Sequence, residues 1–195
     1  VHWLLRAHEI EIAWLHDQCL IEPDRVRTQS GDFYTVFTPY KNNVLRQWHA
    51  HAQPALPSIA LMTSHAGRDL NVCDVPSLGE AFWGDYTPTA HTHTDWVAGE
   101  RAAQTRLDEF CAESLHRYAQ DRDYPNIKGT SGLSPYLAVG ALSARQCWHR
   151  AQLTVHTQEA SELAAEKWQT ELIWRDFYRY IMVGFPYVGQ NLPFK

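Results

Sequence analysis

The stretch EKWQTELIWRDFYRY, residues 166–180, has the composition of a helix with two different faces. On a helix of about 100° per residue, one face is an apolar core stripe of Ile173, Phe177 and Tyr180. Ile181, the residue directly after the stretch, extends this stripe. The opposite third of the circumference carries Trp168, Glu171, Trp174, Arg175 and Tyr178. Such groups can stack on a flat heterocycle, accept a hydrogen bond from it and hold a phosphate. A Glu–Arg ion pair at i, i+4 beside packed aromatics explains this face equally well.

The segments before this stretch also predict helices. In ERAAQTRLDEFCAESLHRYAQDRD, residues 100–123, apolar side chains recur at spacings of three and four: Ala103, Leu107, Phe110, Cys111, Leu115 and Tyr118. Further helices are expected at TSGLSP and LSARQ, and a long one from about residue 160 to 184, before Pro186. Residues 101–195 are therefore predicted to be mainly α-helical.

The stretch GTSGLSPYLAVGALSARQC, residues 129–147, combines hydroxyl groups with glycines ahead of a helix. Ser134 followed by Pro135 has the pattern of an N-cap and a first-turn proline, which would leave helix N–H groups pointing outward toward an anion. A phosphate cradle and a plain capped helix start both fit, and the plain cap is the commoner of the two for these residues alone. Ser143 is expected to cap the following helix.

The first half of the chain is mixed in character. A helix is expected from about residue 7 to 19, a short strand in DFYTVF at residues 32–37, and a helix from Pro39 to about residue 52 that Thr38 caps. From residue 53 to 99 the chain is rich in Pro, Gly, Ser, Thr and His without a sustained period, which indicates a linker. The layout is an α/β remnant, a linker and a helical portion.

Composition excludes several classes of protein. The net charge of -5 and pI near 6.1 argue against binding of nucleic acid through overall basicity, although a local basic face can still bind it. The four cysteines lie far apart and indicate free thiols, and the pairs His49/His51 and His91/His93 have no neighbouring cysteine, so no metal site is predicted. No segment approaches the ~20 apolar residues of a membrane span, and no GxSxG motif is present.

Three segments resemble one family in order and in spacing. VFTPYKNNVLRQW (36–48), RDYPNIKGTSGLSPYLAVGALSARQC (122–147) and ELIWRDFYRYIMVGFP (171–186) resemble DNA photolyases and cryptochromes, most closely bacterial class I cyclobutane pyrimidine dimer photolyases. The resemblance implies that residues 1–52 are the C-terminal part of an α/β antenna domain and that residues 53–100 are an interdomain linker. Residues 101–195 would then be the first part of a helical FAD-binding and DNA-binding domain.

The resemblance also implies roles for individual residues. The FAD-binding positions would be Tyr118, Thr130, Ser131, Gly132, Leu133, Ser134, Trp168 and Arg175. Glu171 and Trp174 would be the catalytic residues that contact the dimer, and the DNA-binding positions would be Arg122, Glu171, Trp174, Arg175 and Tyr178. The implied activity is light-driven repair of pyrimidine dimers in DNA, with reduced FAD as the electron donor, in a cytoplasmic monomer.

The sequence departs from the family at three points. Gly132 stands where the family often has arginine, which removes a cation from the phosphate loop, and Leu4-Leu5 align with an Asn-Glu pair of folate-using members. A folate or deazaflavin antenna chromophore in the full-length protein therefore has no support from these residues. The chain also lacks a start Met and stops before the later helices of the family, so we expect a fragment that binds FAD weakly or not at all.

Alternatives to repair remain open at this stage. A cryptochrome would use the same fold as a light sensor, although Glu171 with Trp174 favours a face that receives a lesion. An inactive truncated remnant, or a helical interaction module, is the other alternative. The residues do not distinguish a cyclobutane dimer from a 6-4 product.

Overall fold

The computed structural model describes residue 6 and residues 16–50, 96–157 and 160–194. By its internal contacts the chain divides into one unit of residues 1–55 and 98–195 and another of residues 56–97. The helices described below belong to the first unit. The expected linker at 53–99 lies almost wholly outside the described residues, and so does most of the helix expected at 7–19; the described residues 16–19 of that segment are not helical.

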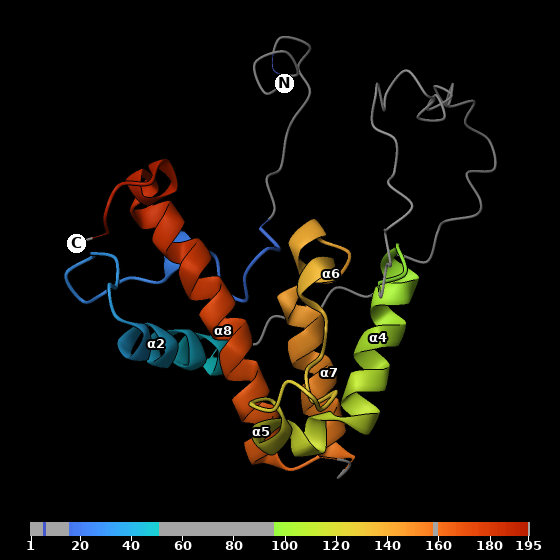
Figure 1. Cartoon of the computed structure of the whole chain (residues 1–195). Helices are drawn as coiled ribbons and strands as arrows, with labels where there is room; N and C mark the ends of the chain where they lie inside the picture. Colours follow the sequence, from blue (N-terminus) through green and yellow to red (C-terminus); the bar gives the residue numbers. More distant parts are fainter. Residues whose placement is uncertain (1–5, 7–15, 51–95, 158–159, 195) are drawn as a thin grey trace, which may run out of the picture. The chain divides into compact units, whose positions relative to one another are not determined.

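The regular secondary structure among the described residues of the first unit is helical (Figure 1). The α-helices are α2 (Phe37–Ala50), α4 (Glu100–Glu113), α5 (Tyr118–Asp121), α6 (Ser134–Val139), α7 (Ala144–His156) and α8 (Glu162–Gly184). Three short 3-10 helices accompany them: η1 (Pro23–Arg25), η2 (Leu115–Arg117) and η3 (Pro186–Gln190). The helices predicted between residues 100 and 184 are confirmed, although the first of them is divided into α4, η2 and α5.

Helix α8 forms the centre of the packing. It contacts α2, α5, α7 and all three 3-10 helices, and Figure 1 shows it running past α2. The predicted core stripe of Ile173, Phe177, Tyr180 and Ile181 is buried, and so is the predicted apolar face of α4, η2 and Tyr118. Because apolar area removed from water stabilises a fold by about 25 cal/mol per Å², burial of these two faces favours association of the helices.

The strand predicted at residues 32–37 is wrong. Residues 32–36 carry no strand, and α2 begins at Phe37, two residues before the proline that was expected to open it. The backbone N–H of Tyr34 donates to the hydroxyl of Tyr180 at 2.6 Å, and the ring of Phe33 lies 4.9 Å from the ring of Tyr180. A side chain of α8 thus satisfies a backbone donor that a strand would have paired with a neighbouring strand.

One of the two predicted serine caps is confirmed. Ser143 caps α7 in a capping box, in which its hydroxyl accepts from the N–H of Gln146 and the Gln146 side chain accepts from the N–H of Ser143. Ser134, however, is the first residue of α6 and does not cap it. Instead, the Ser131 hydroxyl accepts a hydrogen bond from the N–H of Leu133, in the turn that precedes α6.

Two buried cysteines give a prediction about reactivity. Burial raises the pKa of the Cys19 and Cys147 thiols to about 12, and both side chains lie in the protein interior. Because the thiolate is the reactive form, neither residue is expected to react with iodoacetamide at pH 8 in the folded protein, whereas both should react in urea. Peptide mass spectrometry can follow each site separately. Rapid labelling of Cys147 under native conditions would contradict the packing of α7.

Candidate functional site

A cavity of about 330 Å³ lies beside α8, where α5 and α6 approach it. Its lining residues are Tyr118, Ser131, Ser134, Leu137, Ala138, Trp168, Glu171, Leu172, Arg175 and Arg179. Six of these residues were predicted from the sequence as site residues: Tyr118, Ser131, Ser134, Trp168, Glu171 and Arg175. The chain therefore brings residues that are up to 61 positions apart around one hollow of a size typical of small-ligand sites.

Helix α8 supplies one wall of the cavity, with a residue at every turn. Trp168, Glu171 and Arg175 follow one another at spacings of three and four, which places them on the same side of a helix. The Trp168 ring is only 3% exposed and packs on Phe110 of α4, with 4.9 Å between ring centroids. Ser161 fixes the start of the helix, since its hydroxyl accepts from the N–H of Ala164. Packing on Phe110 thus holds the Trp168 ring in place at the cavity.

Glu171 pairs with Arg122 and not with Arg175. The guanidinium of Arg122 donates through Nη1 to Glu171 Oε1 and lies 5.5 Å above the ring of Tyr118. This hydrogen bond raises the pKa of the Arg122 guanidinium. Glu171 and Arg175 therefore do not form the i, i+4 ion pair that was the alternative explanation of this face, and that explanation is wrong. Two residues that the resemblance assigns to DNA contact, Arg122 and Glu171, touch each other at the edge of the cavity.

Arg175 is fixed in place by partners from three segments. Its Nη1 donates to the carbonyl of Gln18 at 2.7 Å and to Asp176 Oδ1 at 2.9 Å, and its Nη2 donates to the carbonyl of Leu137 at 3.1 Å. The Asp176 carboxyl is 1% exposed and also accepts from the N–H of Leu20 at 2.7 Å. Burial raises the pKa of Asp176 to about 6, against the opposing effect of these donors. Arg175 thus presents a preorganised cation to the cavity.

The serine loop is shaped by two glycines. A Cβ on Gly129 would lie 2.5 Å from Cβ of Asp121, so the loop passes too close to α5 for any other residue. Gly132 has φ +61, in the left-handed region that favours glycine. Ser131 and Ser134 line the cavity, whereas the Leu133 side chain is buried in the core and Thr130 is exposed and does not line the cavity.

Trp174 and Tyr178 form a separate aromatic cluster with Phe37 of α2. The rings of Trp174 and Phe37 are stacked, with 3.4 Å between centroids and an interplanar angle of 5°, and Tyr178 lies 5.9 Å from Trp174 on α8. Tyr178 is 63% exposed. Neither Trp174 nor Tyr178 lines the cavity. These two predicted DNA contacts therefore share α8 with Glu171 but are not gathered around the same hollow.

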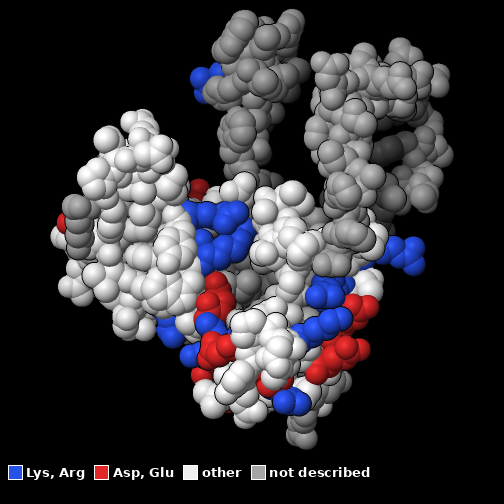
Figure 2. Space-filling view, viewed as in Figure 1, with Lys and Arg blue, Asp and Glu red and all other residues white. Residues whose placement is uncertain are grey.

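Positive charge gathers at the mouth of the cavity. Figure 2 shows Lys and Arg side chains between α8 and α6, with acidic side chains below them in the same view. Arg175 and Arg179 both line this cavity. Arg179 was not predicted as a site residue, although it follows Arg175 by one turn and could have been found on the helical wheel. Leu137 and Ala138 of α6, with Leu172 of α8, complete the lining and carried no signal in the sequence beyond their apolar character.

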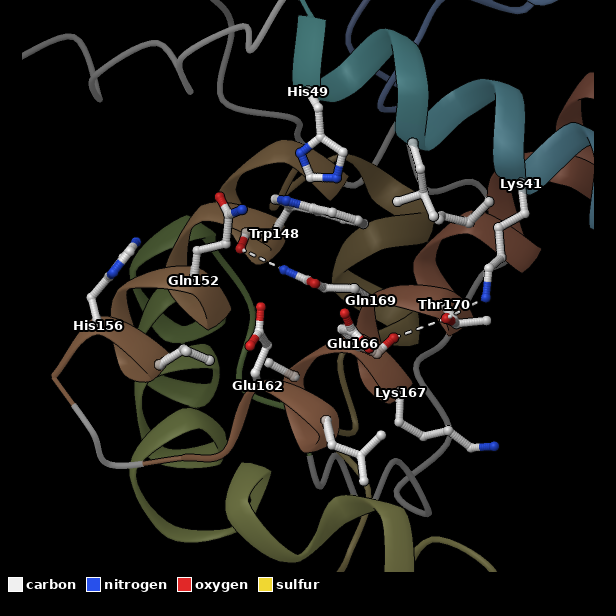
Figure 3. Close-up of a pocket in the computed structure, with 15 residues that line it drawn as sticks. Lys41, His49, Trp148, Gln152, His156, Glu162, Glu166, Lys167, Gln169 and Thr170 are labelled. Carbon is white, nitrogen blue, oxygen red and sulfur yellow. Dashed lines mark hydrogen bonds between the residues drawn. The ribbon is translucent and has the colours of Figure 1, made fainter.

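A second cavity, of about 420 Å³, lies between α2, α7 and α8 (Figure 3). His49 from α2, Trp148 from α7 and Gln169 from α8 point into this region, and the Gln169 side chain donates to the Trp148 carbonyl at 3.4 Å. The Trp148 indole N–H is buried without a hydrogen-bond partner among the described residues. None of the predicted site residues lines this cavity, so it is separate from the candidate site.

The described residues contain neither a candidate membrane span nor a candidate metal cluster. Within residues 16–50, 96–157 and 160–194 no helix is both long and apolar enough to cross a bilayer. The same part of the chain holds no group of three or more His, Cys, Asp or Glu residues suited to a metal ion. His51, His91 and His93 lie outside the described residues.

Comparisons with known proteins agree with the resemblance. The family model for DNA photolyase matches residues 1–59. A deoxyribodipyrimidine photo-lyase of Vibrio cholerae is 38% identical over 182 residues, which is 91% of this chain and 36% of that protein. The deoxyribodipyrimidine photo-lyase of Neurospora crassa is 32% identical over 192 residues, 93% of this chain and 31% of its own length.

A solved structure supports the fold. The bacterial class III photolyase of Agrobacterium tumefaciens superposes with a TM-score of 0.73 at 24% identity, over 96% of this chain and 38% of that one. The chain spans about a third of the length of the curated relatives it matches. Over nearly all of its length the chain is therefore similar in sequence to deoxyribodipyrimidine photo-lyases, and its fold is that of a photolyase.

Proposed function

We propose that the chain is part of an enzyme that repairs pyrimidine dimers in DNA by light-driven electron transfer from FAD. The observation that carries this proposal is the cavity in which a buried indole, a carboxylate, a fixed guanidinium and a serine loop meet. The relatives named deoxyribodipyrimidine photo-lyase support the reaction class. Free, buried thiols fit a reducing compartment, and we place the enzyme in the cytoplasm as a monomer.

The residues around the cavity fit a flavin dinucleotide in kind. Ser131, Gly132 and Ser134 would hold the diphosphate, since the loop offers hydroxyl groups and a glycine backbone without a Cβ. Tyr118 and Trp168 would line the cofactor, and Arg175 would supply a cation that its neighbours already hold in position. Thr130 and Leu133 would contribute through the backbone of the same loop. When bound, FAD supplies the electron that light excitation releases to the dimer.

DNA would approach the face that carries Arg122, Glu171, Trp174 and Tyr178. A dimer must leave the base stack to reach a buried cofactor, and extruding a poorly stacked lesion costs only a few kcal/mol. Glu171 would accept hydrogen bonds from the extruded bases, and the Trp174 ring would pack against them. Arg122 would bind a backbone phosphate. The protein would thereby orient the lesion and exclude water from it.

The test uses the longest expressed form of the protein that contains this chain. After reconstitution with FAD and reduction, an oligonucleotide with one thymine dimer should lose the dimer under blue light and keep it in the dark. Liquid chromatography of the digested strand measures the product. If the flavin-loaded protein binds dimer-containing and undamaged strands equally and leaves the dimer intact in light, the repair proposal is wrong.

A further inference from the structure

The strongest unassigned feature next to the candidate site is the side chain of Arg106 on α4. Its Nε donates to the carbonyl of Ser131 at 3.1 Å, across 25 residues of sequence. A Cβ at residue 132 would lie 2.8 Å from Arg106 Nη2 and 3.5 Å from the guanidinium carbon. The guanidinium of Arg106 therefore occupies the space into which any side chain at position 132 would project.

This arrangement depends on glycine at position 132. Glycine at position 132 serves two purposes. It permits the backbone angle φ +61, and it leaves room for the Arg106 guanidinium where a Cβ would otherwise lie. A guanidinium has five N–H donors in a fixed plane, and the bond to Ser131 uses one of them. The ion pairs within the described part of the chain do not include Arg106. Its charge is therefore not neutralised by a carboxylate of the described residues.

We infer that Arg106 is a binding residue for the diphosphate of the dinucleotide, and that α4 supplies the cation that the loop lacks at position 132. This inference rests on the proposed function, because the ligand is the one proposed for the same loop. Ser131 lines the cavity and Arg106 holds the Ser131 carbonyl, so the guanidinium stands beside the proposed anion site. Planar guanidinium groups bind phosphate oxygens through paired, charge-assisted hydrogen bonds.

The experiment titrates FAD into flavin-free protein, in the longest expressed form that contains the chain, at several salt concentrations. Arg106→Gln keeps a donor for the Ser131 carbonyl but removes the charge, and it is expected to weaken FAD binding about tenfold. The dependence of the dissociation constant on salt should also flatten, because one ionic contact is lost. Arg106→Lys should retain part of the affinity and the salt dependence.

Arg101→Ala is the matched control. Arg101 is an exposed arginine on the same helix, and its removal changes the net charge equally without touching the loop. It should leave the dissociation constant within about twofold. If the unsubstituted protein binds FAD and Arg106→Gln binds it equally well with an unchanged salt dependence, this inference is wrong while the proposed function stands. If the unsubstituted protein does not bind FAD, the proposed function and the inference about Arg106 are both wrong.

Discussion

Replacement of Asp176 by alanine is expected to lower the free energy of unfolding by about 4 kcal/mol at pH 7. The carboxyl joins α8 to the segment before η1, since it accepts from the N–H of Leu20 and from the guanidinium of Arg175. Alanine would leave the buried N–H of Leu20 without an acceptor and Arg175 without its counter-charge. Urea denaturation followed by tryptophan fluorescence measures the change.

Two comparison variants sharpen this test. Asp176→Asn keeps an oxygen for the Leu20 N–H and is expected to cost less than half as much as alanine. Asp108→Ala breaks an exposed ion pair with Arg150, 2.7 Å long, and is expected to cost at most about 1 kcal/mol. If the alanine variant at residue 176 lost no more stability than the variant at residue 108, the carboxyl would not be the link between the two segments.

The pH dependence follows from the raised pKa of Asp176. Its pKa in the folded protein is about 6, above the usual 3.8, so the folded state holds the proton more tightly than the unfolded state does. The stability contributed by this group is complete below about pH 4 and falls as the pH rises to about 6, by about 3 kcal/mol. The stability of the unsubstituted protein relative to Asp176→Asn should therefore decrease over this interval. An increase would show that the ion pair with Arg175 outweighs burial.

The periodic features of the fold could be predicted from the sequence. The apolar faces that contain Leu107 and Phe177 follow helical spacing, and burial of such a stripe requires no knowledge of the partner. Residues 32–37 were misjudged because their β-branched and aromatic composition suits a strand, whereas Tyr34 finds its hydrogen bond on Tyr180. Composition reports what a segment prefers locally, and tertiary contacts overrode that preference here.

Part of the cavity lining could be predicted from the sequence, but the pairings of its side chains could not. Helical spacing placed Trp168, Glu171 and Arg175 on one face, and all three line the cavity. The partner of Glu171 is 49 residues away in sequence, and Arg175 is held by the backbone carbonyls of Gln18 and Leu137. Contacts of this kind depend on how α5, α6 and the N-terminal segment dock on α8. Arg106 was missed for the same reason, because its neighbour Gly132 belongs to another element.

Replacement of Glu171 by alanine is expected to weaken binding of dimer-containing DNA by about 2 kcal/mol, or roughly thirtyfold, while binding of undamaged DNA stays the same or strengthens. The carboxylate would accept hydrogen bonds from the extruded bases, so its loss affects only the lesion. It also neutralises Arg122, and removing it releases that guanidinium for a phosphate. Fluorescence anisotropy with matched strands, with and without a dimer, measures both constants.

Arg122→Ala should instead weaken binding of both DNAs, and this contrast separates the two roles. A phosphate contact carries no sequence or lesion information, so its loss should weaken both DNAs equally, about tenfold, and lower the salt dependence of binding. The double variant should be non-additive, because the two side chains contact each other directly. Glu166→Ala, on the same helix but at the second cavity, controls for the loss of a negative charge. Equal effects of Glu171→Ala on the two DNAs would mean that this carboxylate acts only through Arg122 and never meets the lesion.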